Sequence, residues 1–258
     1  MSDNNSSKSI FNLIPDSFDN ATKNLTDLPT KTIGQTLSDC WYLVFGKLSH
    51  MAEKRRIKYA TELEKFKKEL TSSIETIPDE FRVDADSQVA LLALNNAKFC
   101  VEKEDLRAMY VKLLSSAVDS RKTVHPAFSQ IILSMDYIDA VILSQFKEKK
   151  HIPICNYNIY DSEIHPSKYQ MLATNIIMQK PDNISLLEAS RSIDSLKRLG
   201  LIDTPIGVRI QDDITYDIFK QTELYNDLVS NYSEQLVYIQ KGIAILTNLG
   251  ASFIDCCL

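Results

Sequence analysis

The stretch from Asp79 to Phe146 reads DEFRVDADSQVALLALNNAKFCVEKEDLRAMYVKLLSSAVDSRKTVHPAFSQIILSMDYIDAVILSQF, and it decides the fold. Apolar residues recur in it at the spacing of a helix face, in several short runs. Residues that favour helix starts separate these runs: Pro126 suits a first helical turn, and Asp136 or Asp139 suits a cap. The stretch therefore predicts a bundle of short helices whose apolar faces pack against each other.

The segment before this stretch continues the helical pattern. We expect a short helix near Ser7, a second from Thr30 to Lys47 capped by Thr30 or Thr32, and a third from Leu48 to Ile77. The middle of the second helix, Cys40 to Phe45, is apolar all round, which predicts burial on every side. The third helix carries one apolar stripe, made of Tyr59, Leu63, Phe66, Leu70, Ile74 and Ile77.

The pattern changes after position 150. Residues His151 to Ile159 alternate between apolar and polar side chains, which predicts a strand. Ile184 to Leu199 is typical of two short helices or a helix-turn-helix, closed by Gly200. A short strand, a turn, and a strand or hairpin at Leu236 to Leu246 follow, before a last helix capped by Thr247. This order predicts a winged-helix-like α+β module.

We therefore predict a mainly α protein in three parts. A flexible N-terminal tail with a short helix takes residues 1–25, and a helical bundle domain takes residues 26–150. The winged-helix-like α+β domain takes residues 151–258. The boundary near residue 150 follows a solvated run of charged residues, KEKK.

The composition indicates a globular protein in a reducing compartment. The chain has 258 residues, of which 44% are hydrophobic, so a sizeable core can form. Its net charge of −5 gives no general attraction to nucleic acid or to an anionic membrane. The five cysteines form no CxxC pair and no secretory signal opens the chain, so we expect a cytoplasmic location.

Five sequence landmarks stand in order along the chain. They are LRAMYVKLLSSAVD (Leu106–Asp119), HPAFSQII (His125–Ile132), DYIDAVIL (Asp136–Leu143), LKRLGLI (Leu196–Ile202) and ILTNLGASFIDCC (Ile245–Cys257). Together they resemble the Abi-alpha (abortive infection alpha) family, a bacterial group also described as a domain of unknown function. The resemblance extends over residues 25 to 258.

The resemblance implies a bacterial cytoplasmic protein linked to abortive phage infection. It implies no catalytic motif, so we expect a defence protein that is not an enzyme and has no cofactor. Such a protein would act through an interaction with an unknown protein partner from the host or the phage. A homo-oligomer fits the same expectation.

No cluster of reactive side chains accompanies the landmarks. His125 precedes Pro126 at an expected helix start, where a capping role explains it. The spacing of His151, Cys155 and His165 matches no standard zinc pattern, and the paired acids before helices suit the helix dipole. We therefore predict no catalytic residue, no metal site and no cofactor-binding residue.

Nucleic-acid binding by a winged-helix regulator is one alternative. Three basic residues, Arg191, Lys197 and Arg198, could line one helix of the C-terminal module and contact DNA. From Tyr160 onward, however, thirteen acidic residues outnumber eight basic ones, whereas a DNA-reading domain normally carries a basic surface. The balance favours protein interaction over DNA binding.

Contact with a membrane surface is the other alternative. Trp41, Tyr42 and Phe45 belong to an apolar segment that precedes an amphipathic helix. Seven basic and four acidic residues lie between Glu53 and Leu70 of that helix. Such a pair of segments could lie on a bilayer as a peripheral effector. The mixed charge favours instead a buried segment followed by a solvated helix.

Overall fold

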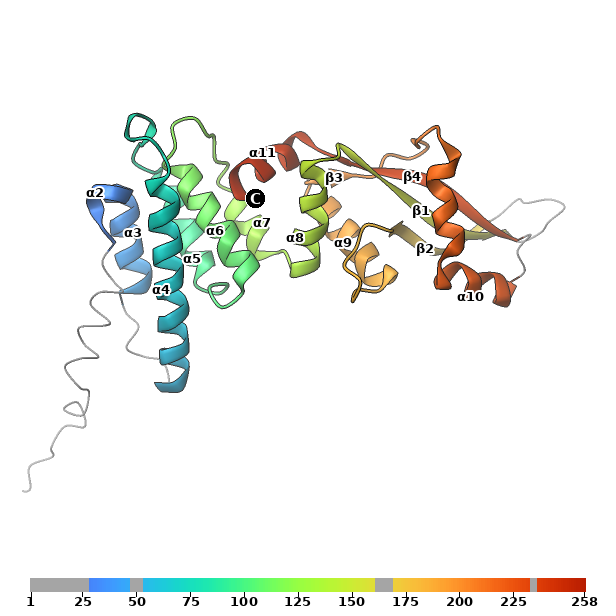
Figure 1. Ribbon diagram of the computed structural model, residues 1–258, viewed down its shortest axis with the longest axis horizontal. Helices are drawn as coiled ribbons and strands as arrows, with labels where there is room; N and C mark the ends of the chain where they lie inside the picture. The colour runs from blue at the N-terminus through green and yellow to red at the C-terminus, as the bar shows by residue number, and fades with distance from the viewer. Residues whose placement is uncertain (1–27, 47–52, 161–168, 233–235) are drawn as a thin grey trace, which may run out of the picture. The chain divides into compact units, whose positions relative to one another are not determined.

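A computed structural model describes residues 28–46, 53–160, 169–232 and 236–258 (Figure 1). The chain folds into two compact units: unit 1, Met1–Ser129, and unit 2, Gln130–Leu258. This division falls earlier in the chain than position 150, where the sequence pattern changes. The helix expected near Ser7 lies outside the described residues.

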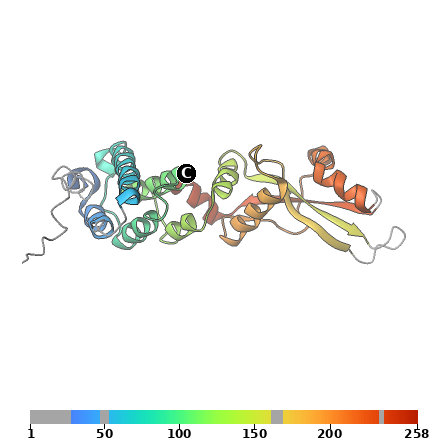
Figure 2. The same cartoon turned by 90° about the horizontal axis from the view of Figure 1, so that it is seen from below.

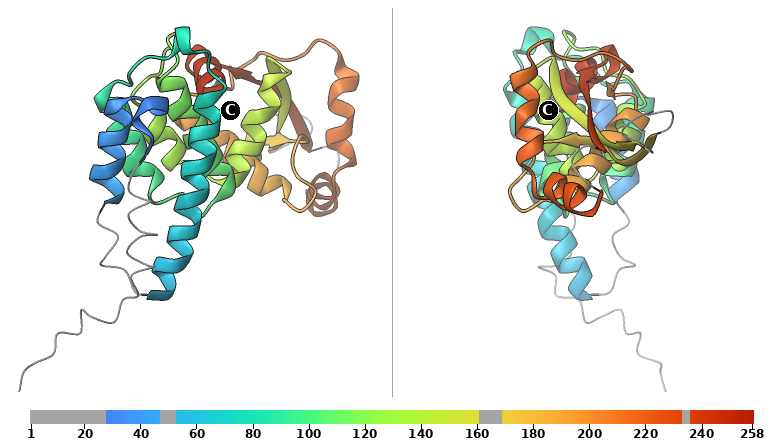
Figure 3. Two further views of the ribbon diagram at one scale, coloured as in Figure 1. Left: turned by 60° about the vertical axis from the view of Figure 1, so that its left-hand side comes forward. Right: turned by 90° about the vertical axis from the view of Figure 1, so that its right-hand side faces the viewer.

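Unit 1 is built from helices in its described part. They are α2 (Thr30–Ile33), α3 (Gln35–Phe45), α4 (Glu53–Glu75), the 3-10 helix η3 (Asp79–Phe81), α5 (Ser87–Ala97), α6 (Glu104–Ala117) and the start of α7 (Phe128–Leu133). The long helix α4 packs against α6, and α5 packs against both α3 and α6 (Figure 3). The predicted bundle of short helices is therefore present up to Ser129, whereas the helix predicted after Asp136 belongs to unit 2.

The apolar stripe predicted on the third helix is confirmed. Five of its residues lie in α4, Ile77 follows the helix, and all six side chains are buried. Their spacing of three and four residues places them on one side of the helix, which faces the core. Pro78 comes directly after the stripe and starts the turn into η3.

The helix predicted from Thr30 to Lys47 is divided, and its predicted caps are wrong. Gly34 interrupts it with a left-handed φ of 84° and separates α2 from α3. The start of α3 is capped from far along the chain: Asp84 accepts hydrogen bonds from the Thr36 backbone N–H (3.2 Å) and hydroxyl (2.7 Å). The capping carboxylate lies 48 residues away, beyond the reach of a local sequence pattern.

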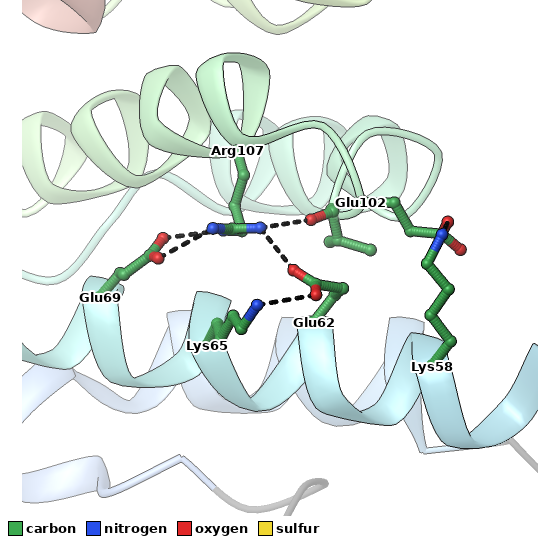
Figure 4. A network of polar contacts seen from close by, with 7 residues as sticks. Lys58, Glu62, Lys65, Glu69, Glu102 and Arg107 are labelled. Carbon is green, nitrogen blue, oxygen red and sulfur yellow. Dashed lines mark hydrogen bonds and ion pairs between the residues drawn. The ribbon is translucent and has the colours of Figure 1, made fainter.

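A buried arginine joins α6 to α4 (Figure 4). Arg107 donates through Nη1 to Glu62 (2.8 Å) and to the Val101 carbonyl (2.9 Å), and through Nε and Nη2 to Glu69 (3.0 and 3.1 Å). Although burial opposes its charge, the carboxylates of Glu69 and Glu62 hold the pKa of Arg107 above its ordinary value. This paired set of charged hydrogen bonds fixes the register of the two helices.

Unit 2 combines helices with a four-stranded antiparallel sheet of order β2-β1-β4-β3 (Figure 2). Its strands are β1 (His151–Tyr160), β2 (Tyr169–Ile177), β3 (Ile202–Asp203) and β4 (Val237–Leu246). Its helices are the rest of α7, α8 (Tyr137–Ser144), η4 (Gln145–Lys147), α9 (Leu186–Arg198), η5 (Asp213–Gln221), α10 (Glu223–Tyr232) and α11 (Asn248–Cys257). The strands expected at His151–Ile159 and Leu236–Leu246 are confirmed, and β2 was not predicted.

The predicted winged-helix-like module is wrong. A single helix, α9, takes the place of the predicted helix pair, because the Ser185–Glu188 capping box starts it once and no turn interrupts it. The turn at Pro205–Gly207 is followed by η5, whereas a winged helix would continue into a further strand. The long strands β1 and β4 pair over nine residue pairs, which a small β wing does not do. Unit 2 is therefore an α+β fold on a four-stranded antiparallel sheet.

The helical segment η5–α10 covers one face of this sheet. Tyr157 of β1 lies in a buried cluster with Tyr216 and Phe219 of η5. Its hydroxyl donates a hydrogen bond to the Phe219 carbonyl (2.7 Å). Side chains of successive strand residues point to opposite faces, so Asn156 and Asn158 lie on the other face of the sheet.

Candidate binding site

A cavity of about 270 Å³ lies on this other face of the unit 2 sheet. Residues of β1, β2 and β4 line it, together with Lys197 of α9 and the loop Thr204–Gly207. Among the described residues, no aspartate or glutamate belongs to the lining. We call this feature the sheet cavity.

The pairing of β1 with β4 brings the lining side chains together. Asn156 lies opposite Gln240, and Ile154 lies opposite Gly242. Directly opposed residues of antiparallel strands share one face, so these four positions line the same side of the sheet.

Side-chain amides form a hydrogen-bonded network at the sheet cavity. Gln240 Oε1 accepts from the Nδ2 groups of Asn156 and Asn158, both at 3.2 Å. Asn158 is buried, and its Oδ1 has no hydrogen-bond partner. Gln240 Nε2 donates no hydrogen bond within the part of the chain that the structure describes. The network therefore has one unused donor on Gln240, which lines the cavity, and one unused acceptor on Asn158, which is buried outside the lining.

Asn175 holds the network to β2 and to α9. Its backbone N–H donates to Asn156 Oδ1 (2.7 Å), and its Nδ2 donates to Asp194 Oδ1 of α9 (2.7 Å). Asn175 has a left-handed φ of 52°, and the pairing of β1 with β2 shifts register beside it. Non-glycine residues in this conformation concentrate at functional sites, because a surrounding structure must hold them there.

Lys197 supplies a cation to the wall of the sheet cavity. Its Nζ donates to Thr204 Oγ1 (2.6 Å) and lies 3.6 Å from the Asp203 carboxylate. The Lys197 side chain is half exposed, and an ammonium group has three N–H donors. The group can therefore bind an anion while it keeps its contact with Thr204.

Gly242 leaves open space at the floor of the sheet cavity. A Cβ atom built at this position would lie 3.5 Å from Ile154 Cγ1, which is ordinary van der Waals contact. A small side chain therefore fits there without a clash. Because residue 242 faces the cavity, the outer atoms of a larger side chain would fill it.

Cys155 also borders the sheet cavity, but its side chain packs with Tyr157 in the buried cluster on the opposite face of the sheet, and its thiol is not activated. Burial raises the pKa of this thiol well above its ordinary value, so it stays protonated near neutral pH. A protonated thiol is a poor nucleophile. Within the described ranges, no group of three or more His, Cys, Asp or Glu residues is placed to hold a metal ion.

The three cations predicted as nucleic-acid contacts have different surroundings on α9. Lys197 lines the sheet cavity, whereas Arg191 lies 3.9 Å from Glu188 and Arg198 is exposed outside the lining. By helix geometry, positions 191 and 198 share one side of α9, and position 197 lies about a third of a turn away. The three side chains do not form one basic stripe.

The residues proposed for membrane contact also separate. Trp41 and Phe45 are buried with ring centroids 4.6 Å apart, and Trp41 also packs against Phe66. In this fold their rings belong to the core of unit 1, while the Tyr42 side chain is exposed. In the described part of the chain, no helix combines the length and apolar character needed to cross a bilayer.

Sequence reasoning identified Lys197 but missed the amide side chains around it. The NYN run at positions 156–158 carried a signal, since its period of two places two amides on one face of a strand. Gln240 gave no such signal. It lies 84 residues from Asn156, and only the pairing of β1 with β4 brings the two together.

A protein-family model described as abortive infection alpha matches residues 58–257. The chain belongs to this family. The match covers most of the chain and agrees with the resemblance seen in the sequence landmarks. No curated protein and no solved structure matches the chain significantly.

Two C-terminal landmarks of this abortive infection alpha protein support one turn of the fold. In the first, Gly200 follows the end of α9 at Arg198, and its φ of 75° lets the Leu201 N–H donate to the Leu196 carbonyl (3.0 Å). In the second, Gly250 of α11 approaches the Leu201 carbonyl so closely that a Cβ atom there would collide with it. Together they fix the turn from which the loop wall of the sheet cavity departs.

Proposed function

We propose that this chain is a bacterial abortive-infection defence protein that acts by binding and not by catalysis. The observation that carries the proposal is the family match over residues 58–257. In this proposal the protein works in the cytoplasm, where phages replicate, and its response passes through contacts with a host or phage protein.

The chemistry of the sheet cavity supports a binding role. Its polar side chains carry amides, hydroxyls and ammonium groups, which hold ligands by hydrogen bonds and charge. The thiol of Cys155 packs on the opposite face of the sheet and is held protonated by burial, so it is not poised to attack a substrate in the cavity. Cavities with a few convergent polar groups among apolar walls are typical of small-molecule sites.

The defence role is tested by phage plating. The chain is expressed in a bacterial host and challenged with a broad panel of phages, beside an empty-vector control. We expect lower plating efficiency for at least one phage, with infected cells dying before they release progeny. Equal plating on both hosts across the panel would argue against the defence role.

A further inference from the structure

We propose that the sheet cavity binds a nucleotide, with the amide network reading the base and Lys197 holding the phosphate. This goes beyond the defence role, which does not name a ligand. The inference rests on three features of the cavity: its amides, its cation and its apolar walls.

The amide network has the groups that recognise a nucleobase. Gln240 accepts two hydrogen bonds through Oε1, which orients its Nε2 donor and leaves it unused among the described residues. Asn158 beside it is buried outside the lining of the cavity, and its hydrogen bond to Oε1 helps to hold Gln240 in place. The unused N–H donor of an oriented side-chain amide can pair with an acceptor on a base edge. Because hydrogen bonds hold Asn156 and Asn158 against Gln240, a base would meet a network that is already oriented.

The charge of the lining favours an anionic part in the ligand. Lys197 brings an ammonium group to the wall, and no described aspartate or glutamate lines the cavity. The nearest carboxylate to Lys197, that of Asp203, lies 3.6 Å away and neutralises it only in part. A phosphate, with several acceptor oxygens, can replace this long contact with shorter charge-assisted hydrogen bonds.

The apolar walls and the size limit the ligand to one nucleotide. Ile154 and Met171 line the cavity from the sheet, and Ile206 lines it from the loop with 95% of its surface exposed. These side chains offer flat contact area to an aromatic ring. The volume of about 270 Å³ lies just below the usual range for small-molecule sites of about 300–1,000 Å³. A nucleic-acid strand is disfavoured, because acidic residues outnumber basic ones from Tyr160 onward.

The test is isothermal titration calorimetry of the full chain. The probes are AMP, GMP, CMP and UMP, the four matching nucleosides, and inorganic phosphate. We expect one or more of the monophosphates to bind with a stoichiometry of one. The matching nucleoside and phosphate alone should each bind at least about tenfold more weakly, since each engages only half of the site. Phosphate binding as tight as the nucleotide would mean an adventitious ion only, and would overturn the proposal.

Two variants locate the binding. Gly242→Val fills the floor of the cavity with a residue that strands favour, and Lys197→Gln removes the cation; each should weaken the nucleotide at least about tenfold. Arg198→Gln is the matched control on the same helix and should bind like the wild type. Thermal unfolding shows whether each variant is folded. If Gly242→Val does not fold, the affinity of Lys197→Gln for the nucleotide decides the test.

Three further results would overturn the nucleotide proposal. The first is that no monophosphate binds at millimolar concentration, and the second is that the folded cavity variants bind as the wild type does. Loss of binding in Arg198→Gln as well as Lys197→Gln would indicate a basic surface instead of the cavity, and would equally overturn it. Phage plating is a separate measurement, so the defence role can stand when nucleotide binding fails.

Discussion

At the scale of single residues, Arg107 has the most specific geometry in unit 1. Its guanidinium reaches both oxygens of Glu69, one oxygen of Glu62 and a backbone carbonyl, and its side chain is almost fully buried. A lysine carries the same charge but cannot form the paired bonds to Glu69.

We expect Arg107→Lys to lower the free energy of unfolding by about 1–2 kcal/mol, because the fork of charged hydrogen bonds is lost. Urea denaturation measures the change. Lys58→Gln is the control, since Lys58 and Glu102 form an exposed ion pair with side chains 68% and 45% accessible. Such pairs contribute little, so the control should unfold near the wild-type midpoint. Equal losses in the two variants would contradict the account of Arg107.

Asp139 is the clearest pH-sensitive residue of unit 2. Its Oδ2 accepts from the Ser195 hydroxyl (3.0 Å) and the Asp136 N–H (3.2 Å), while its Oδ1 has no hydrogen-bond partner. Burial, with the nearby charge of Asp136, raises the pKa of this carboxyl above its ordinary value of 3.8. A group with a raised folded pKa stabilises the fold fully below its unfolded pKa. That contribution is lost as the pH rises through the folded pKa.

Asp139→Asn should therefore gain stability relative to the wild type as the pH rises above 3.8. The neutral amide avoids burying a charge at every pH. Thermal unfolding across this pH range measures the difference. Asp217→Asn, at an exposed position of η5, serves as the control. If the difference in unfolding temperature between Asp139→Asn and the wild type stays constant with pH, Asp139 does not carry a buried charge.

At the scale of elements, the sequence predicts those helices and caps that depend on residues close together in the chain. The helical period located the stripe of α4, and Thr247 and Asp136 cap α11 and α8 as proposed. The predictions that failed have other causes. Gly34 divides one predicted helix where Asp84 comes close to it, and one capping box makes α9 a single helix where two were a reasonable expectation. The winged-helix interpretation failed because element order does not determine strand pairing.

The packing of α11 on the turn after α9 gives an element-scale prediction. Gly250→Ala places a Cβ atom against the Leu201 backbone carbonyl, which cannot move as a flexible side chain can. We expect a loss of about 2–3 kcal/mol in the free energy of unfolding, measured by urea denaturation. Gly242→Ala is the matched control, because its Cβ would meet Ile154 at an ordinary 3.5 Å. If both alanines are tolerated, the close approach of α11 does not constrain the fold.

At the scale of the whole molecule, the sheet cavity joins segments that lie far apart in the chain. Asn156, Lys197 and Gln240 come from β1, α9 and β4. The sequence predicted Lys197 only as a DNA contact, because a basic residue in a helical segment can be recognised from the neighbouring residues alone. Its role beside an amide network became visible only with the strand register. The cavity could therefore be predicted only in part, through the two amides of the NYN run.

The most direct test of a defence protein that acts through its sheet cavity is phage plating with the cavity variants. Hosts expressing the wild type, Lys197→Gln, Gly242→Val or Arg198→Gln at equal levels are compared with an empty vector. The account predicts reduced plating with the wild type and Arg198→Gln, and plating restored to the vector level with the two cavity variants. Full protection by folded Lys197→Gln and Gly242→Val proteins would contradict it.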